Sequence, residues 1–289
     1  MKVALAQMKV GPDPSVNLRR GVEWIRKAGE GGAAAICFPE LSFLPFFPQA
    51  RCDRQYFQWA ETIPGPTTDR MCEAACATQI GVIANIYETT KRGDFYNTAI
   101  IVDADGVLKG KYRMGHIAEG PGFNEKFYYW PGDSGYPVFQ SRIGRIGVAI
   151  CHDRNFPEVF RCLALEGAEV VFVPTVFSLS AYREAPAFLE ISQQAASLAN
   201  GIFTVCVNRV GPGGCAKPDP DGEANEEKLT ACGNSLVTNP FGSVIGRAAL
   251  EREDIAIVEI NPAEVLDARH RRPYFRDRRP ETYTRLHAN

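Results

Sequence analysis

Short apolar segments rich in β-branched residues alternate along this chain with segments of helical periodicity. Such alternation is typical of α/β proteins, in which sheets and helices form separate packed layers. Leu18, Val22 and Ile25 share one face of a first predicted helix. Three further helices are predicted over 67–78, 157–167 and 185–199. Ten strands are predicted over 3–8, 33–38, 81–86, 98–102, 107–112, 145–150, 170–173, 202–207, 235–238 and 255–260.

Composition, net charge and apolar runs indicate the domain organisation and exclude some classes of partner. The chain has no low-complexity linker, so we expect one domain over 1–289, with 261–289 as a C-terminal tail. The net charge of −2 argues against a nucleic-acid partner, although basic residues cluster at 269–276. No apolar run approaches the roughly 20 residues that span a bilayer, and the N-terminus lacks the pattern of a signal peptide. We therefore expect a cytoplasmic protein that binds neither nucleic acid nor membrane.

Nine cysteines are scattered along the chain, and in a long cytosolic protein most are reduced and buried. Cys72 and Cys76 lie four apart on a predicted helix and can place two thiols on one face. A zinc site needs about four N or S ligands, and none of the four histidines is near this pair. We expect no metal and no cofactor.

Two predicted buried strands end in side chains that can carry chemistry. The strand at 33–38 leads into Glu40, and the strand at 145–150 leads into Cys151. In open α/β sheets, ligands collect beyond the carboxyl ends of strands. A carboxylate and a thiol presented there can share one pocket. The one clearly polar loop, 211–228, comes late in the chain.

Cys151 is the candidate nucleophile and Glu40 the candidate base. A thiol with an ordinary pKa of about 8.5 needs a base or a positive neighbour to attack a carbonyl at neutral pH. Apolar residues surround Glu40 in the segment 38–41, FPEL, and a half-buried carboxylate is suited to taking and returning a proton. Each residue alone also fits a plain structural role, because buried cysteines and helix-capping glutamates are common.

Seven ordered segments resemble those of the nitrilase superfamily of carbon–nitrogen hydrolases. Three of them correspond to its successive signatures: 38–41 (FPEL), 110–113 (GKYR) and 150–158 (ICHDRNFPE). The others are 122–129 (GFNEKFYY), 131–133 (PGD), 167–169 (GAE) and 275–281 (FRDRRPE), the last similar to the tail of N-carbamoyl-amine amidohydrolases. The resemblance implies a four-layer α-β-β-α sandwich with a Glu-Lys-Cys triad. It makes Glu40 the base, Cys151 the nucleophile, and Glu125 a second glutamate that positions substrate and catalytic groups; Glu125 also fits a surface salt bridge with Lys126.

One position departs from the family pattern. The catalytic lysine of the family falls on Met114, and a thioether can supply neither positive charge nor a hydrogen bond. Lys111 is a candidate replacement if a bulge turns it, because a three-residue offset on a strand points to the opposite face. His116, Lys126 and the backbone N–H groups after Cys151 are the other candidates. Loss of activity is the remaining alternative, in which the fold serves as a small-molecule binding module or scaffold.

The expected substrate is a small linear amide or N-carbamoyl compound, cleaved through a Cys acyl-enzyme. Arg154 matches an arginine with which carbamoyl-amino-acid hydrolases of the family bind a carboxylate, and a salt bridge to Asp153 or Glu158 is the alternative. His152, through its backbone N–H, is a candidate oxyanion donor, and Tyr112 is a further candidate substrate contact. The family also implies a homodimer or larger homo-oligomer built through the tail.

Overall fold

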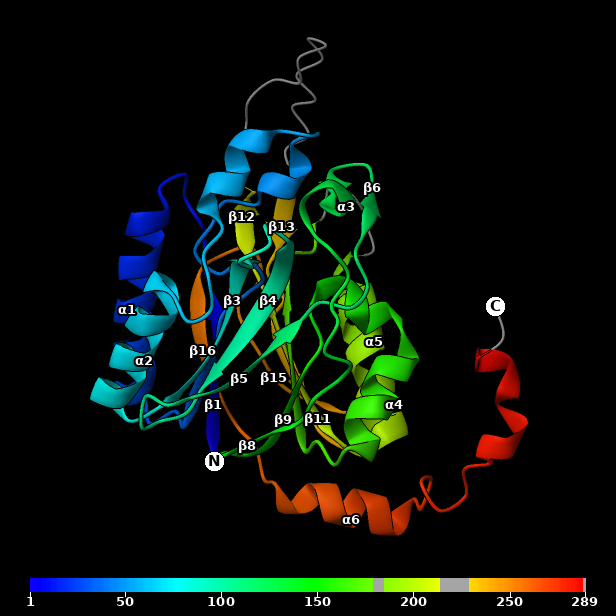
Figure 1. Cartoon of the computed structure of the whole chain (residues 1–289). Helices are drawn as coiled ribbons and strands as arrows, with labels where there is room; N and C mark the ends of the chain where they lie inside the picture. Colours follow the sequence, from blue (N-terminus) through cyan, green and yellow to red (C-terminus); the bar gives the residue numbers. More distant parts are fainter. Residues whose placement is uncertain (179–184, 214–228, 288–289) are drawn as a thin grey trace.

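The computed structural model describes residues 1–178, 185–213 and 229–287. Two six-stranded sheets stack face to face between two outer layers of helices (Figure 1). This confirms the α-β-β-α sandwich. No helix among the described residues is long and apolar enough to cross a membrane.

The strands divide between the two sheets. The first sheet contains, in spatial order, β16 (Asp254–Glu259), β1 (Lys2–Gln7), β2 (Ala35–Cys37), β3 (Gly81–Thr89), β4 (Phe95–Val102) and β5 (Leu108–Arg113). The second contains β15 (Val244–Arg247), β14 (Leu236–Thr238), β11 (Phe203–Asn208), β10 (Val170–Thr175), β9 (Gly144–Val148) and β8 (Phe139–Ser141). Two small ribbons pair β6 (Glu119–Gly120) with β7 (Phe123–Asn124), and β12 (Val210–Pro212) with β13 (Thr230–Cys232).

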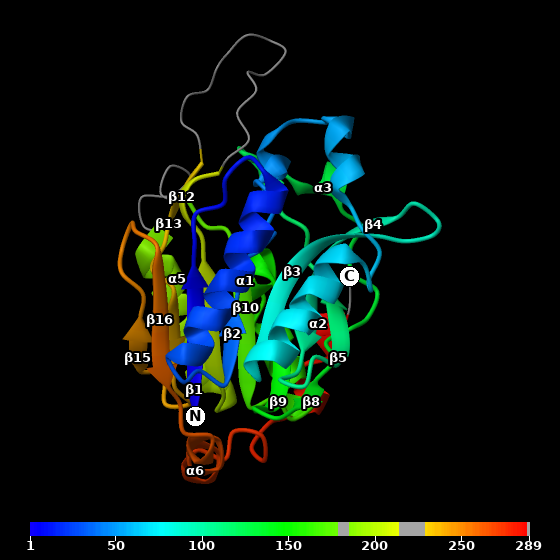
Figure 2. The same cartoon turned by 90° about the vertical axis from the view of Figure 1, so that its left-hand side faces the viewer.

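Helices cover the outer faces of both sheets. The first sheet carries α1 (Pro14–Glu30) and α2 (Pro66–Thr78), which Figure 2 shows in front of it. The second sheet carries α4 (Pro157–Leu165) and α5 (Ala185–Asn200). A short α3 (Glu125–Tyr128) contacts the 3₁₀ helix Phe47–Gln49. The helix α6 (Ala263–Arg271) lies at the end of the sandwich where β1 begins (Figure 1).

The central strands are parallel and buried on both faces, which explains their continuous apolar composition. In the first sheet β1 pairs with β2, and β2 with β3; in the second, β10 lies between β9 and β11. Alternate side chains of the two sheets meet in one core, for example Leu5 and Ile83 with Phe172 and Val205. The remaining faces pack under the helices in two separate clusters.

All ten predicted strands and all four predicted helices are confirmed, with ends shifted by a few residues. The strands β8 and β15 were missed because they are short edge strands, and an edge strand needs an apolar face only where it contacts the core. The helices α3 and α6 and the two ribbons were missed as well. Most of the predicted polar loop, 214–228, lies outside the described residues.

Candidate active site

Glu40 and Cys151 come from opposite sheets and meet between them. Glu40 follows β2, and Cys151 follows β9 and begins the 3₁₀ turn Cys151–Asn155. Cys151 has a positive φ of 45°, as does Leu41 directly after Glu40. A non-glycine residue with positive φ is strained and persists only where its surroundings hold it, which often happens at functional sites. Each strand therefore ends in a sharp turn that directs a reactive side chain into the gap between the sheets.

The carboxylate of Glu40 is buried and well supplied with hydrogen bonds. Its Oε1 accepts from Nδ2 of Asn97 at 2.7 Å, and its Oε2 accepts from the backbone N–H of Val176 at 3.0 Å. Burial raises the pKa of Glu40, while hydrogen bonds from Cys151 and Asn97 and the charge of Arg209 act in the opposite sense. A carboxylate whose pKa is raised by burial and lowered by hydrogen bonds can accept a proton from the thiol and return it.

The Cys151 thiol is also buried, with 4% of the residue exposed. Its Sγ lies 3.6 Å from the carbonyl oxygen of Val176 and 3.6 Å from Nη1 of Arg154. Burial and the negative charge of Glu40 raise the pKa of Cys151 well above its usual range, and the charge of Arg154 opposes that rise. The resting thiol is therefore protonated and needs a base during attack, which Glu40 is placed to provide.

Glu125, at the start of α3, is a second buried carboxyl group beside Glu40. Neither of its oxygens makes a hydrogen bond of good geometry with the described residues, and the same is true of the neighbouring Tyr129 hydroxyl. Burial and the charge of Glu40 raise the pKa of Glu125 well above its usual range, and the Ala118 N–H and Arg154 oppose this only in part. Of the two carboxyls, Glu125 is the one whose pKa burial raises further, which favours its protonated form.

A hollow of about 250 Å³ opens onto the thiol. Arg154 lines it, with its guanidinium stacked 4.3 Å over the ring of Phe177. Its other lining residues are Ala118, Glu119, Gly120, Pro121, Phe123, Cys151, His152, Asn155, Val176 and Phe188. The hollow has room for a small molecule whose carbonyl reaches Sγ, with aromatic walls on several sides.

A model of the carbon-nitrogen hydrolase family matches residues 2–270. The chain belongs to the carbon–nitrogen hydrolase family. It is 34% identical over 286 residues to an N-carbamoylputrescine amidase of Solanum lycopersicum, covering 97% of this chain and 93% of the relative.

Solved structures agree with this assignment. A carbon-nitrogen hydrolase from Helicobacter pylori G27 superposes with a TM-score of 0.91 at 26% identity, covering 99% of this chain and 98% of that one. A mutant of the amidase from Nesterenkonia sp. AN1 superposes with a TM-score of 0.78 at 25% identity, covering 99% and 96%. That second structure shows the acetamide moiety of fluoroacetamide covalently added at its active site cysteine.

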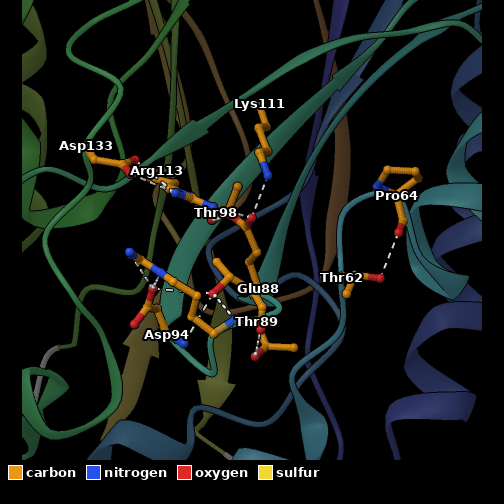
Figure 3. Close-up of polar contacts among 11 residues, drawn as sticks. Thr62, Pro64, Glu88, Thr89, Asp94, Thr98, Lys111, Arg113 and Asp133 are labelled. Atoms are coloured by element: carbon orange, nitrogen blue, oxygen red, sulfur yellow. Dashed lines mark hydrogen bonds and ion pairs between the residues drawn. The ribbon is translucent and has the colours of Figure 1, made fainter.

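Lys111 does not join the site of this carbon–nitrogen hydrolase. It lies on β5 opposite Ile100, on the face of the first sheet that turns away from the second sheet. Its Nζ donates to Oε1 of the buried Glu88 at 2.5 Å, and Arg113 binds the same carboxylate (Figure 3). No bulge turns Lys111 inward, because the pairing irregularity of β5 falls before it, at Leu108. The predicted replacement of the triad lysine by Lys111 is therefore wrong for this structure.

Tyr112 supports the turn at Cys151 and does not line the hollow. Its hydroxyl donates to Oδ2 of Asp153 at 2.7 Å, and the residue is buried and absent from the lining of the hollow. Oδ2 also accepts from the N–H of Ile150 at 3.0 Å, while Oδ1 binds His116 Nδ1 at 2.8 Å. Asp153 thus ties the turn after β9 to β5, which corrects the predicted role of Tyr112 as a substrate contact. Asp153 also binds the ring of His116, which was one candidate replacement for the lysine.

Met114 lies on the inner face of the first sheet, in the same core cluster as Cys151. Its backbone N–H donates to the carbonyl of Asn97 at 2.9 Å, so the two residues are cross-strand neighbours whose side chains share a face. Asn97 reaches Glu40 from that face, so position 114 lies on the same side of the sheet as the carboxylate. Lys126 lines a different hollow, with Phe127 and Trp130. Among the described residues, no three His, Cys, Asp or Glu side chains gather as metal ligands, and the expectation of no metal or cofactor stays a prediction.

Several residues that shape the site carry little signal in the sequence. Asn97 and Val176 position Glu40, Thr175 accepts a hydrogen bond from Arg154 at 3.2 Å, and Arg209 donates to the backbone carbonyl of Glu40 at 2.8 Å. They lie within or beside buried strands, where an isolated polar residue has no distinctive spacing. The one available sign was a polar residue at the end of an apolar strand, as at Thr175 and Arg209.

Proposed function

We propose that this carbon–nitrogen hydrolase is a thiol amidase that cleaves a non-peptide C–N bond through a Cys151 acyl-enzyme. The observation that carries the proposal is the Cys151 thiol at a strained turn, opening onto a hollow and hydrogen-bonded toward the buried Glu40 carboxylate. Nucleophile, base and substrate space are the minimum set for covalent acyl transfer.

In the mechanism Glu40 takes up and returns a proton twice, first from Sγ to the departing nitrogen and then from water to Sγ. Glu40 takes the Sγ proton as sulfur adds to the substrate carbonyl carbon, and the carbonyl electron pair moves onto oxygen. The C–N bond then breaks, and the departing nitrogen receives the proton from Glu40. Water attacks the thioester with Glu40 again as base, and the Sγ–C bond breaks to restore the thiol. The N–H of His152 is our candidate donor to the oxyanion.

A linear amide or an N-carbamoyl compound is the proposed substrate class. The matched relative from Solanum lycopersicum is named for an N-carbamoyl substrate, and the hollow of about 250 Å³ suits a small molecule. Glu125, buried beside Glu40 with a raised pKa, does not line the hollow, so it is a candidate to position Glu40 and Cys151. Burial lowers the pKa of His152, so a neutral imidazole borders the hollow.

Ammonia release and adduct formation test this proposal together. The chain is incubated with N-carbamoylputrescine, N-carbamoyl-β-alanine and simple ω-amides, and Cys151 is followed by mass spectrometry. We expect turnover of at least one compound and an acyl adduct on Cys151. Cys151→Ala removes both, whereas Cys206→Ala, another buried free cysteine of the second sheet, keeps both. Wild-type turnover by Cys151→Ala would show that the mechanism is wrong.

The second candidate is a binding module without turnover, and Met114 at the position of the family's lysine is the observation that favours it. Such a protein gains thermal stability with ligands of the same panel but releases no ammonia from any of them. Turnover of one panel compound decides for the amidase.

We also propose that residues 1–289 act as one cytoplasmic domain and that 261–289 contact another copy in a homo-oligomer. In support, the segment after α6 runs outward from the sandwich (Figure 1), and it exposes Tyr274, Tyr283 and Leu286. Light scattering after size-exclusion chromatography measures the number of subunits per particle. A chain that ends at Arg272 is expected to form particles with fewer subunits. An unchanged multimer would exclude the tail.

A further inference from the structure

A buried thiol near two carboxyl groups becomes a better nucleophile when a positive charge lies beside it. Cys151, Glu40 and Glu125 are all nearly or fully buried, and attack on a carbonyl moves negative charge onto the substrate oxygen. In a site shielded from water, a fixed cation stabilises that charge far more than it would in solution. Met114 provides none.

Within 1–178, 185–213 and 229–287, the basic side chains near the site are engaged elsewhere, with one exception. Lys111 binds Glu88, and His116 binds Asp153. Arg209 donates to the backbone carbonyls of Glu40, Leu41 and Leu44. It therefore fixes the backbone that carries Glu40.

Arg154 is the exception. Its Nη1 lies 3.6 Å from Sγ of Cys151, and it donates to the carbonyl of Cys151 at 2.7 Å and to Oγ1 of Thr175 at 3.2 Å. These contacts and the stacking on Phe177 at 4.3 Å fix the guanidinium. The charge therefore needs little reorganisation when the thiolate and the oxyanion form.

We propose that Arg154 provides to Cys151 the positive charge that the family's lysine would provide from position 114; the inference rests on the proposed thiol mechanism. Arg154 keeps its own proton throughout, because guanidinium is not deprotonated in proteins. The proton of Sγ goes to Glu40, the new S–C bond forms, and the guanidinium faces the negative charge in the thiolate and then in the oxyanion.

This role differs from the predicted one, in which Arg154 binds a substrate carboxylate. A carboxylate clamp affects KM for acidic substrates and leaves the free thiol unchanged. A cation at Sγ affects the thiol itself, in the absence of any substrate, because a change of one unit in a thiol's pKa changes the thiolate fraction about tenfold.

The test is the pH dependence of Cys151 alkylation by iodoacetamide, in which an S–C bond forms and iodide leaves. Peptide-resolved mass spectrometry separates Cys151 from the other cysteines. For Arg154→Met we expect a rate at pH 7.5 lower by about tenfold or more and a midpoint moved to higher pH. Arg154→Lys keeps part of the rate, and adding Met114→Lys to Arg154→Met restores part of it.

Arg161→Met is the matched control, because Arg161 is a half-buried arginine of α4 whose Nη2 donates to Ala199 and which stacks on Phe275. We expect wild-type alkylation from it. If Arg154→Met does not fold, as judged by circular dichroism, Arg154→Gln replaces it as the uncharged variant.

Alkylation of the uncharged variant within twofold of wild type would overturn the proposal. A rise in KM confined to acidic substrates would then identify the carboxylate clamp. Because alkylation needs no turnover, absence of ammonia release from the wild type would remove the proposed function without altering this result.

Discussion

Glu125 can be tested through its proton, by the substitution Glu125→Gln. The carboxyl is fully buried and makes no hydrogen bond of good geometry with the described residues. Burial and the charge of Glu40 raise the pKa of Glu125 in the folded protein. Glutamine has nearly the same shape and does not titrate, so the substitution removes the ionisation while keeping the packing.

The expected sign follows from proton binding in the two states. The folded protein keeps a proton on Glu125 that the unfolded chain releases above a pH of about 4.3. The stabilising contribution of this group is therefore full below that pH, and it is lost as pH rises toward the folded pKa. Each pH unit in this window changes the free energy of unfolding by at most about 1.36 kcal/mol, hence by about 2.7 kcal/mol between pH 5 and pH 7.

Thermal unfolding measures the effect. For a chain of this size about 1 kcal/mol corresponds to roughly 2 °C in Tm, so Tm of Glu125→Gln relative to wild type should rise by up to ~5 °C between pH 5 and pH 7. The control is Glu88→Gln, at another buried glutamate. Burial alone would raise the pKa of Glu88, but hydrogen bonds from Arg113 and Lys111 lower it overall. Its stabilisation is therefore present above the unfolded pKa and lost as pH falls.

The two variants should consequently show slopes of opposite sign in different pH windows, Glu125→Gln above the unfolded pKa of about 4.3 and Glu88→Gln as pH falls through and below it, with Glu88→Gln level toward pH 7. Glu125→Gln gains on the wild type with rising pH, and Glu88→Gln falls behind it. A Tm difference for Glu125→Gln that is flat or shrinks with rising pH would refute the assignment of a proton to Glu125 in the folded protein.

Three further substitutions test the surroundings of Cys151. Met114→Lys should raise the Cys151 alkylation rate at pH 7, measured by mass spectrometry, because an ammonium group then lies on the same side of the sheet as Glu40; a lower rate in a folded variant contradicts this. Asn97→Leu removes the donor 2.7 Å from Oε1 of Glu40 and should lower kcat/KM by roughly tenfold or more, since a hydrogen bond to a charged group contributes about 1.5–3 kcal/mol. Tyr112→Phe should lower the free energy of unfolding in urea by about 1–3 kcal/mol with KM nearly unchanged; a large rise in KM alone would restore Tyr112 as a substrate contact.

The sequence predicted the framework of the fold because its central strands are parallel and buried on both faces. A strand such as Val170–Thr175, buried at all six positions, reads as an apolar run whatever lies around it. Short pieces such as Phe139–Ser141 and Glu125–Tyr128 are defined by what they pack against. Local propensity cannot specify a four-residue helix, because nucleation alone is unfavourable.

The site was predictable where a reactive residue ends a strand, as at Glu40 and Cys151. The direction of a side chain on a strand was predictable too, because alternation places Lys111 and Tyr112 on opposite faces. What each inward side chain binds was not predictable. Tyr112 contacts Asp153, from a segment 41 residues away, and only the stacking of the two sheets brings those groups together.

The charges of the site make Met114, Glu125 and Arg154 parts of one arrangement. Three acidic groups, counting the thiol, lie close together and are buried or nearly so, and a lysine there could balance a second negative charge. Without it, Glu40 can ionise because Asn97 and Val176 donate to it, while the Ala118 N–H and Arg154 offset the burial of Glu125 only in part, so its pKa stays raised and the protonated form is favoured. Arg154 is then left facing the sulfur rather than a carboxylate. A methionine at position 114 is therefore compatible with a working thiol as long as Glu125 stays protonated and Arg154 stays charged.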